Sequence, residues 1–182
     1  MDVMQAIEKR RAIRNYTPEA VPSEQLTRLV DAAIQAPSAN NAQPWHFTII
    51  RDTELLDRIS GAAKRHMLQI MPEGNPIREH LLDPKFHIFH HAPVLVLISA
   101  RDVDWACEDS ALAAENLMLA ACEMGLGTCW IGFAQRWLET EEGKEAVNLP
   151  RGYQPVAPII VGWPQEPAPP VPRKIPPIHW TD

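Results

Sequence analysis

Two short polar segments hold most of the side chains in this chain that could do chemistry. The first contains three arginines, Arg10, Arg11 and Arg14, followed by Tyr16. Guanidinium groups are permanently charged, and their planar N–H groups match phosphate and carbonyl oxygens. The second segment, residues 37–45, contains hydroxyl and amide side chains between prolines that stiffen the backbone. Together the two segments predict a binding site for an anionic cofactor.

Each segment alone also has an ordinary structural explanation. The arginines can offset the negative end of a helix dipole, and Ser, Asn and Gln side chains often serve turns. Other familiar motifs fail: Gly125-x-Gly127 lacks the third glycine of a dinucleotide loop and follows a predicted helix. The sequence also has no Walker phosphate loop and no Gly-x-Ser-x-Gly turn of a serine hydrolase. The combination of the two polar segments therefore carries the cofactor hypothesis.

The cysteines and histidines form no familiar ligand pattern. Cys107, Cys122 and Cys129 are odd in number and match neither a disulfide framework nor a C-x-x-C pair. We expect them to be reduced and mostly packed in the core. The histidines within residues 87–91 have no acidic or cysteine residue at ligand spacing nearby, and Pro93 ends any helix that would align them. We therefore expect no metal site.

The composition fits one folded domain. The chain has 182 residues, of which 46% are hydrophobic and 22% are charged. Lys and Arg number 17 against 23 Asp and Glu, so the net charge is −6, and no basic run is long enough to follow a nucleic acid. The apolar runs are too short to cross a bilayer, and the N-terminus lacks a secretory apolar stretch. We expect a cytoplasmic protein with no nucleic-acid or membrane partner.

Apolar periodicity predicts helices that pack on a sheet and position the polar segments. The expected helices begin after Asp2, at residues 22–23 and after residues 52–53, and two more cover residues 104–124 and about 137–147. The expected strands are residues 46–50, 94–99, 128–132 and 156–161. Because helices and strands alternate, we expect an α/β arrangement of one sheet covered by helices.

The C-terminal tail differs from the rest of the chain. Residues 164–177 contain seven of the 18 prolines, a density that excludes helix and favours an extended chain. Trp163, Ile178 and Trp180 are apolar anchors, so we expect the tail to wrap a surface of its own domain or of a partner subunit. A disordered tail is the alternative. The run 169–172 also fits the weak P-x-x-P motif of a partner ligand.

The polar segments belong to a longer series along the chain. Residues 10–16 and 37–45 are followed by Gly125-Leu126-Gly127, by Trp130-Ile131-Gly132, and by Arg173-Lys174 near the C-terminus. This series resembles the nitroreductase family of flavin enzymes, and Pro-Ser-x-x-Asn-x-Gln-Pro-Trp is its most specific part. The resemblance implies an α+β fold, a three-layer α/β/α sandwich with a mostly antiparallel central sheet. It also implies an intertwined homodimer with two FMN sites at the subunit interface.

The resemblance divides the chain into an FMN-binding domain, residues 1–163, and a tail, residues 164–182. It implies that Arg10 reaches the phosphate of FMN, together with Arg173 or Lys174 from the tail. Arg11 and Ala12 fall at the pyrimidine edge of the flavin, and Arg14 faces its N1 and O2 atoms. Many relatives have Ser where this chain has Ala12, so a hydroxyl contact is lost.

The remaining cofactor residues come from two other places. The resemblance implies that a segment of the other subunit packs beside the ring and ribityl chain, and its members are Pro37, Ser38, Ala39 and Asn41. Gln43 is expected to be a strut within that segment rather than a direct contact. The segment Ile131-Gly132 matches the place where a backbone N–H approaches flavin N5, and a glycine permits that close approach.

The resemblance implies an FMN-dependent oxidoreductase with a ping-pong order. NADH or NADPH gives a hydride to the flavin, and a small electron-poor acceptor, nitroaromatic or quinone-like, then takes up the electrons. No catalytic side chain is required, because the cofactor carries the chemistry. In the resemblance, residues 65–91 belong to the substrate side of the site, and little of their sequence can be matched to the family. Two alternatives stay open: another reaction of the superfamily (dehydrogenase, dehalogenase or flavin-modifying), or a non-catalytic flavin-binding dimeric interaction protein.

Overall fold

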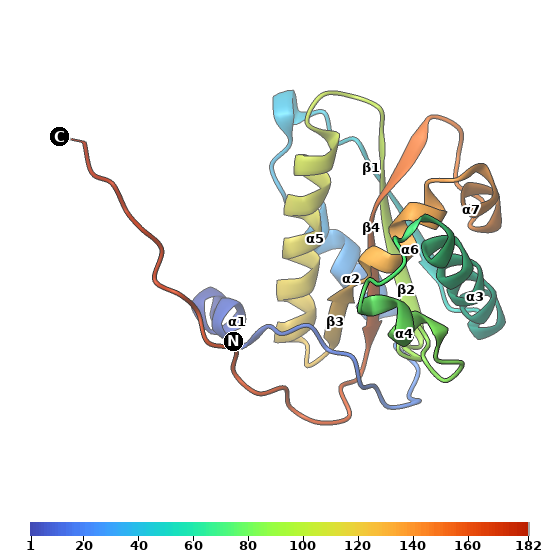
Figure 1. Cartoon of the computed structure of the whole chain (residues 1–182). Coiled ribbons are helices and arrows are strands. Elements are labelled where there is room, and N and C mark those ends of the chain that lie inside the picture. Colours follow the sequence, from blue (N-terminus) through green and yellow to red (C-terminus); the bar gives the residue numbers. More distant parts are fainter. Residues whose placement is uncertain (182) are drawn as a thin grey trace.

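A computed structural model describes residues 1–181, and its centre is a four-stranded sheet with helices on both faces (Figure 1). The strand order is β1-β2-β4-β3, and every neighbouring pair is antiparallel. The strands are β1 Trp45–Ile50, β2 Val94–Arg101, β3 Gly127–Trp130 and β4 Tyr153–Gly162. The expected class, α+β with an antiparallel central sheet between helical layers, is confirmed.

The central strand β2 explains why two hydrophobic cores form. Its residues from 94 to 100 are buried on both faces, and successive side chains of a strand point to opposite sides. Leu95 and Leu97 pack beneath α3 (Thr53–Ile70) and α6 (Gly132–Leu138). Val96 and Ile98 pack beneath α2 (Ser23–Ala33) and α5 (Ala106–Glu123). The layered sandwich follows directly from this alternation.

Two helix starts that the sequence predicts are confirmed. In α1 (Val3–Lys9) the Asp2 carboxylate accepts a hydrogen bond from the Gln5 N–H at 2.8 Å. In α3 the Asp52 carboxylate accepts one from the Leu55 N–H at 3.1 Å. Each carboxylate satisfies an N–H group that the first helical turn leaves without a backbone acceptor.

Other boundaries differ from the expected ones. Helix α5 begins at Ala106 instead of residue 104, because Trp105 adopts a left-handed conformation with φ of 66°. Strand β3 ends at Trp130, and Gly132 already begins α6. The single helix expected over 137–147 is two helices, α6 and α7 (Glu141–Ala146), because Thr140 ends one and caps the other. Helix α4 (Ile77–Leu82) was not expected from the sequence.

The tail follows its own domain only at the start. Trp163 packs against the core and its Nε1–H donates to the Ala20 carbonyl at 3.4 Å. Further on, the tail runs away from the domain as an extended chain (Figure 1), where Ile175 is 94% exposed and Trp180 is 80% exposed. Of the expected anchors, Trp163 packs on its own domain, whereas Ile178 and Trp180 are exposed in the single chain, and packing of this part of the tail on a partner subunit stays a prediction. Within residues 1–181, no helix combines the length and apolarity needed to span a membrane.

Candidate functional site

The arginine segment lies along the outer edge of β3. The Ile13 N–H donates to the Thr128 carbonyl at 2.9 Å, and Ala12 forms a parallel bridge with Thr128. Gly127 permits this approach, since a Cβ there would lie 2.7–2.9 Å from three side-chain atoms of Ile13. The edge of the sheet therefore holds the chain between Arg10 and Arg14 in one place.

Arg10 and Arg11 border a cavity of about 490 Å³ between α1, the end of α5 and the start of the tail. Lys9 adds a third cation, and Glu8 and Glu166 are acidic members of the lining. Arg10 Nε lies 3.3 Å from a carboxylate oxygen of Glu115 on α5. The volume is within the range of small-molecule sites, and the cations suit an anionic group.

The two arginines have different partners. The Arg11 guanidinium donates to three backbone carbonyls, at 2.6 Å to Glu8, 2.7 Å to Arg10 and 3.2 Å to Pro169. It therefore ties the start of the tail to the end of α1. Arg10 has no carbonyl partner of this kind among residues 1–181 and meets only the half-exposed Glu115 carboxylate. Arg10 is thus the more available of the two for a phosphate.

Arg14 is exposed and faces the other end of β3. Burial raises the pKa of the Cys129 thiol, and Arg14 and Arg10 act in the opposite direction. Burial also lowers the pKa of His90 to about 4, and the Arg14 cation adds to this effect. His90 is therefore a neutral imidazole beside a permanent cation at pH 7. The Tyr16 hydroxyl donates to the Ile13 carbonyl at 2.7 Å and fixes the backbone that carries Arg14.

The backbone opens to solvent where β3 meets α6. The Ile131 N–H donates to the Pro158 carbonyl at 2.8 Å, so that group is committed to the sheet. Gly132 is exposed, and a Cβ at this position would meet no atom within 4 Å. As the first residue of a helix, Gly132 has no intrahelical acceptor for its N–H. A flat ring can approach this N–H, and of the pair Ile131 and Gly132 only Gly132 offers one.

Phe133, which follows Gly132 in α6, belongs to a group of aromatic rings. Phe133 packs edge-on to Phe86, with ring centroids 6.5 Å apart. The Phe86 ring centroid also lies 3.9 Å from that of His80 and 5.7 Å from that of His90. The Lys64 ammonium donates to the carbonyls of Asp83 and Phe86 and so holds the turn that presents Phe86. Residues 65–91, whose sequence shows little resemblance to the family, thus supply His80 and Phe86. With Phe133 these rings form what we call the aromatic wall.

The loop of residues 37–45 lies at the opposite end of α5 from the arginines. The Ala39 N–H donates to both carboxylate oxygens of the buried Asp109, at 3.1 and 3.3 Å, in the first turn of α5. The cavity beside Arg10 reaches Cys122, thirteen residues further, which is about 20 Å along a helix. Figure 1 shows this loop in light blue beside one end of α5 and α1 beside the other.

Internal bonds hold the conformation of this loop. The Gln43 backbone N–H donates to the Ser38 hydroxyl at 3.0 Å, and the Gln43 side-chain Nε2–H donates to the side-chain Oδ1 of Asn41 at 3.1 Å. Gln43 therefore braces this loop through both its backbone and its side chain, in line with the strut that the resemblance implies. Asn41 and Gln43 both have positive φ, a conformation that such short networks support.

The single chain therefore brings together only some of the expected cofactor residues. One group gathers along the edge and end of β3: Arg10, Arg11, Ala12, Arg14, Ile131 and Gly132. The loop residues Pro37, Ser38, Ala39 and Asn41 lie elsewhere. Arg173 and Lys174 are exposed in the extended tail, beyond the tail residues that line the cavity beside Arg10.

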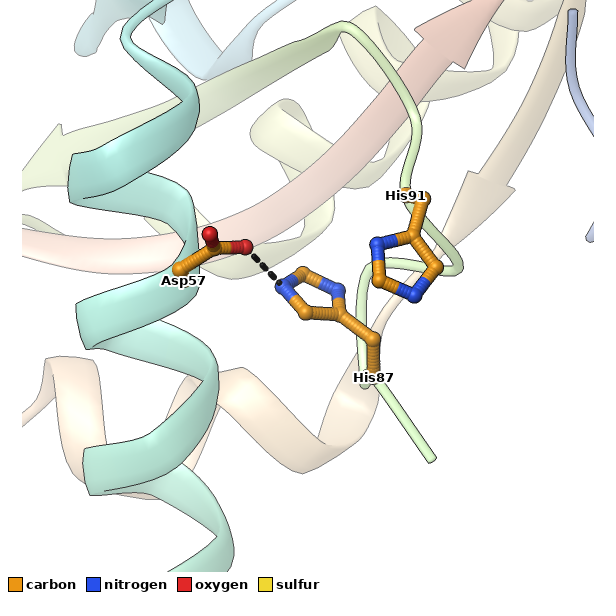
Figure 2. Close-up of side chains that lie close together, drawn as sticks. All are labelled: Asp57, His87 and His91. Carbon is orange, nitrogen blue, oxygen red and sulfur yellow. Dashed lines mark ion pairs between the residues drawn. The ribbon is translucent and has the colours of Figure 1, made fainter. Parts of the chain in front are cut away.

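Sequence reasoning missed several partners of these groups. Asp109 and Glu115 face the loop and Arg10 from α5, and their spacing gave no signal. The expectation that the histidine cluster has no acidic neighbour is wrong, because α3 brings Asp57 within 3.1 Å of His87 (Figure 2). The three cysteines are unpaired as expected, but Cys107 is exposed instead of packed.

Comparison with known proteins gives one family. The family model described as "Nitroreductase family" matches residues 7–163 of this chain. A solved structure of a nitroreductase with bound FMN from Bacteroides fragilis superimposes with a TM-score of 0.87, covers 100% of both chains and is 25% identical.

Two relatives show the range of activities in this similarity. An iodotyrosine deiodinase of Thermotoga neapolitana is 30% identical over 171 residues, covering 91% of this chain and 90% of that protein. A protein of Methanothermobacter thermautotrophicus, which bears the name NADH dehydrogenase/NAD(P)H nitroreductase, is 46% identical over 59 residues. That match spans 32% of this chain and only 31% of the relative's length. The match over residues 7–163 and the shared fold decide the assignment: the chain belongs to the nitroreductase family.

Proposed function

We propose that this protein is an FMN-dependent oxidoreductase that uses NADH or NADPH to reduce a small electron-poor acceptor. One observation carries the proposal: the open backbone at Gly132 and the Arg14 cation lie at the same end of β3, beside an aromatic wall. This arrangement suits a flat ring that gains negative charge on reduction. It occurs in a chain whose family includes structures with bound FMN.

The chain offers a fitting group for each part of FMN. Arg10, at the rim of the 490 Å³ cavity, would hold the phosphate. Arg14 would face the pyrimidine end of the ring, and the Gly132 N–H its central edge. Ala12 is exposed on the same edge and offers backbone groups only. Arg11 would act indirectly, because its guanidinium already holds the backbone between α1 and the tail.

We infer that a second copy of the chain completes each site. The loop of residues 37–41 is held by Asp109 in the first turn of α5, whereas the cavity beside Arg10 lies near the other end of that helix, so one chain does not bring the two to one site. Arg173 and Lys174 are exposed in the tail, three and four residues beyond Pro170 at that cavity. The exposed apolar side chains of α1 and the tail are unusual for a monomer; they include Val3, Met4, Ile7, Ile175, Ile178 and Trp180. A twofold dimer would bury these side chains and bring the segments together.

When bound, FMN supplies the redox chemistry, because its ring can take up a hydride and release electrons. The residues of this chain would bind FMN, orient the donor and the acceptor beside it, and shield the site from water. We place the donor and the acceptor in turn beside Gly132, in a ping-pong order that needs no side-chain nucleophile. Phe86 and Phe133 would limit water on that side, and the neutral His90 adds no positive charge of its own there. The three unpaired cysteines fit a reducing, cytoplasmic setting.

Nitroaromatic or quinone-like compounds are the first acceptor class. Reductive dehalogenation is the second, favoured by the likeness to an iodotyrosine deiodinase over 91% of this chain. In that reaction a carbon–iodine bond is replaced by carbon–hydrogen, iodide leaves with the bonding electrons, and NAD(P)H supplies the hydride equivalent.

An anaerobic acceptor panel with the FMN-loaded protein tests the proposal. Consumption of NADH or NADPH with a nitroaromatic compound or a quinone supports the first class. Release of iodide from 3-iodotyrosine with little nitro or quinone reduction supports the second. Protein that holds FMN but turns over none of these acceptors would contradict the proposed activity. Free FMN at the same concentration is the control.

A further inference from the structure

Asp57, His87 and His91 form a compact cluster that the proposed oxidoreductase site does not use (Figure 2). Asp57 projects from α3, and the two histidines lie in the loop that precedes β2. One potential ligand atom from each of the three side chains lies within 4.8 Å of the other two. Two imidazoles and a carboxylate are a donor set typical of divalent transition metals.

The fold holds this loop against α3 in a defined conformation. The Ile88 N–H donates to the buried Ser60 hydroxyl at 3.1 Å, one helical turn beyond Asp57. Ile88 and Phe89 are fully buried and anchor the loop in the core. His91 has φ of 54°, a left-handed conformation that a non-glycine residue seldom adopts. The geometry of the cluster therefore comes from packing on both sides.

The contact between Asp57 and His87 has the spacing of two ligands of one metal. His87 Nε2 lies 3.1 Å from Asp57 Oδ1, yet this buried nitrogen has no partner with hydrogen-bond geometry among residues 1–181. Two ligands of a tetrahedral zinc ion stand about 3.3 Å apart, with neither lone pair aimed at the other. The observed separation of 3.1 Å is already close to this distance.

His91 needs only a small movement to join. Its ring stacks on that of His87 with centroids 4.5 Å apart and planes inclined by 29°. The side chain is exposed, so rotation can bring a ring nitrogen from at most 4.8 Å to ligand distance without moving the core. Asp57, with its side chain 68% exposed, is free to adjust in the same way.

We propose that Asp57, His87 and His91 bind one Zn²⁺ ion, which fastens the loop of residues 87–91 to α3. Nitrogen-rich ligands disfavour Mg²⁺ and Ca²⁺, which prefer oxygen. Three protein ligands leave a fourth position for water. The same loop carries His90, which contacts the aromatic wall, so the ion would also steady that wall.

Two features set the strength of this site. His87 Nδ1 accepts the Phe89 N–H at 3.2 Å, so in the metal-free protein the ring proton sits on Nε2. Zinc binding at Nε2 moves this proton to Nδ1 and costs the Phe89 N–H its acceptor. Lys64 also lies near the cluster, although its ammonium is bound to two carbonyls. Binding is therefore weaker than at a structural zinc site but still stoichiometric.

Calorimetric titration of Zn²⁺ into chelator-treated, tag-free, FMN-loaded protein tests the site directly. We expect one Zn²⁺ per chain in the wild type and at least about tenfold weaker binding in both Asp57→Asn and His91→Asn. Both substitutions are at exposed positions, so the variants should fold and keep their FMN spectrum. His66→Asn, on the same helix as Asp57, is the matched control and should bind zinc like the wild type.

Three results would overturn the site. They are no stoichiometric zinc binding by the wild type, wild-type affinity in either ligand variant, or an equal loss of affinity in His66→Asn. A second readout uses stability, because a ligand that binds only the folded state raises the unfolding temperature. Zinc should raise this temperature in the wild type and in His66→Asn, and not in the two ligand variants.

Discussion

Arg14 has surroundings that suit a role in tuning a cofactor. It is exposed at the end of β3, close enough to Cys129 and His90 to influence the pKa of each. Tyr16 fixes its backbone, and burial raises the pKa of Tyr16 far above the usual value, so the hydroxyl stays protonated and donating. A permanent cation held in this way favours negative charge on a neighbouring ring.

The variant Arg14→Ala should therefore bind FMN more weakly and give the bound flavin a lower reduction potential. The loss of one charge-assisted hydrogen bond costs about 1.5–3 kcal/mol of binding free energy, which corresponds to a dissociation constant roughly 10- to 150-fold larger. Fluorescence titration with FMN and a reductive titration measure both quantities. Arg136→Ala, an exposed arginine on α6, is the control and should change neither. Unchanged titrations in Arg14→Ala would refute its role.

His90 predicts how stability depends on pH. Its pKa is about 4 in the folded protein against 6.5 for the ordinary side chain, mainly because it is buried. The unfolded chain therefore binds more protons between pH 6.5 and about pH 4, and stability should fall as the pH falls through this window. Burial lowers the pKa of His87 as well, so the two effects act in the same direction.

Urea unfolding midpoints at pH 7.5, 6 and 5 measure this dependence. We expect His90→Asn to reduce the loss of stability on acidification, with His87 responsible for the part that remains. Asparagine suits the position because His90 has a positive φ of 51°. His179→Asn, in the exposed tail, should keep the wild-type profile. A profile of His90→Asn identical to that of the wild type would show that this imidazole does not titrate as described.

At the level of elements, the junction of β3 and α6 separates structural from functional glycines. Gly127 touches Ile13, and an added methyl group would meet its side chain at 2.7 Å. Gly132 has open space instead, and that space is where we place the ring. The two positions lie five residues apart but should respond in opposite ways to the same substitution.

We expect Gly127→Ala to destabilise the fold by about 1–3 kcal/mol through overpacking. We expect Gly132→Ala to leave stability within about 0.5 kcal/mol and to weaken FMN binding, because the methyl group occupies the approach to the N–H. Urea unfolding of the apo-protein and FMN titration separate these effects. If Gly132→Ala bound FMN like the wild type, the proposed ring position would be wrong.

The sequence predicts elements well where the signal is local. The caps at Asp2 and Asp52 are carboxylates next to periodic apolar residues, and both helices begin there. The start of α5 differs from the expected one because Trp105 is left-handed, a conformation that its residue type does not signal. Thr140 split one expected helix into two, since a threonine within a polar run gives little warning of a cap.

The candidate site follows the same division. The arginine segment and Gly132 could be predicted as site residues from their residue types and from the order of the motifs along the chain. A guanidinium can bind an anion and a glycine can permit a close approach whatever the rest of the fold. The pairing of Asp57 with His87 could not, because the two residues lie thirty positions apart and meet only when α3 packs on the loop. The place of the loop 37–45 at the far end of α5 likewise depends on Asp109, which receives the Ala39 N–H.

At the level of the whole molecule, the main feature is that the expected cofactor residues fall into two separate groups, the arginine segment with the end of β3 and the loop of residues 37–41. The loop that contains Ala39 lies at the start of α5, α1 lies beside the other end, and the last part of the tail extends away from the domain (Figure 1). A domain that binds its cofactor within one chain has no use for this separation. A symmetric dimer does, because each interface then joins one arginine segment to the loop and tail of the partner.

The double variant Arg173→Ala/Lys174→Ala tests the tail. Both side chains are exposed in the single chain, so folding should be unaffected, while FMN affinity should fall by roughly tenfold or more if they reach the phosphate. Arg28→Ala/Arg151→Ala removes the same charge from exposed positions elsewhere and should keep wild-type affinity. Sedimentation of each variant shows whether the dimer is retained. Wild-type FMN affinity in the tail variant would remove these two cations from the site.

The most direct measurement is the visible absorption spectrum of the purified protein with added FMN, recorded under anaerobic conditions before and after NADH or NADPH. The account predicts stoichiometric FMN binding, a flavin spectrum that bleaches with the nucleotide, and recovery of the spectrum when an acceptor is added. Bound FMN that neither nucleotide bleaches would contradict the proposed donor. Failure to bind FMN at all would contradict the central claim that Arg10, Arg14 and Gly132 form a flavin site.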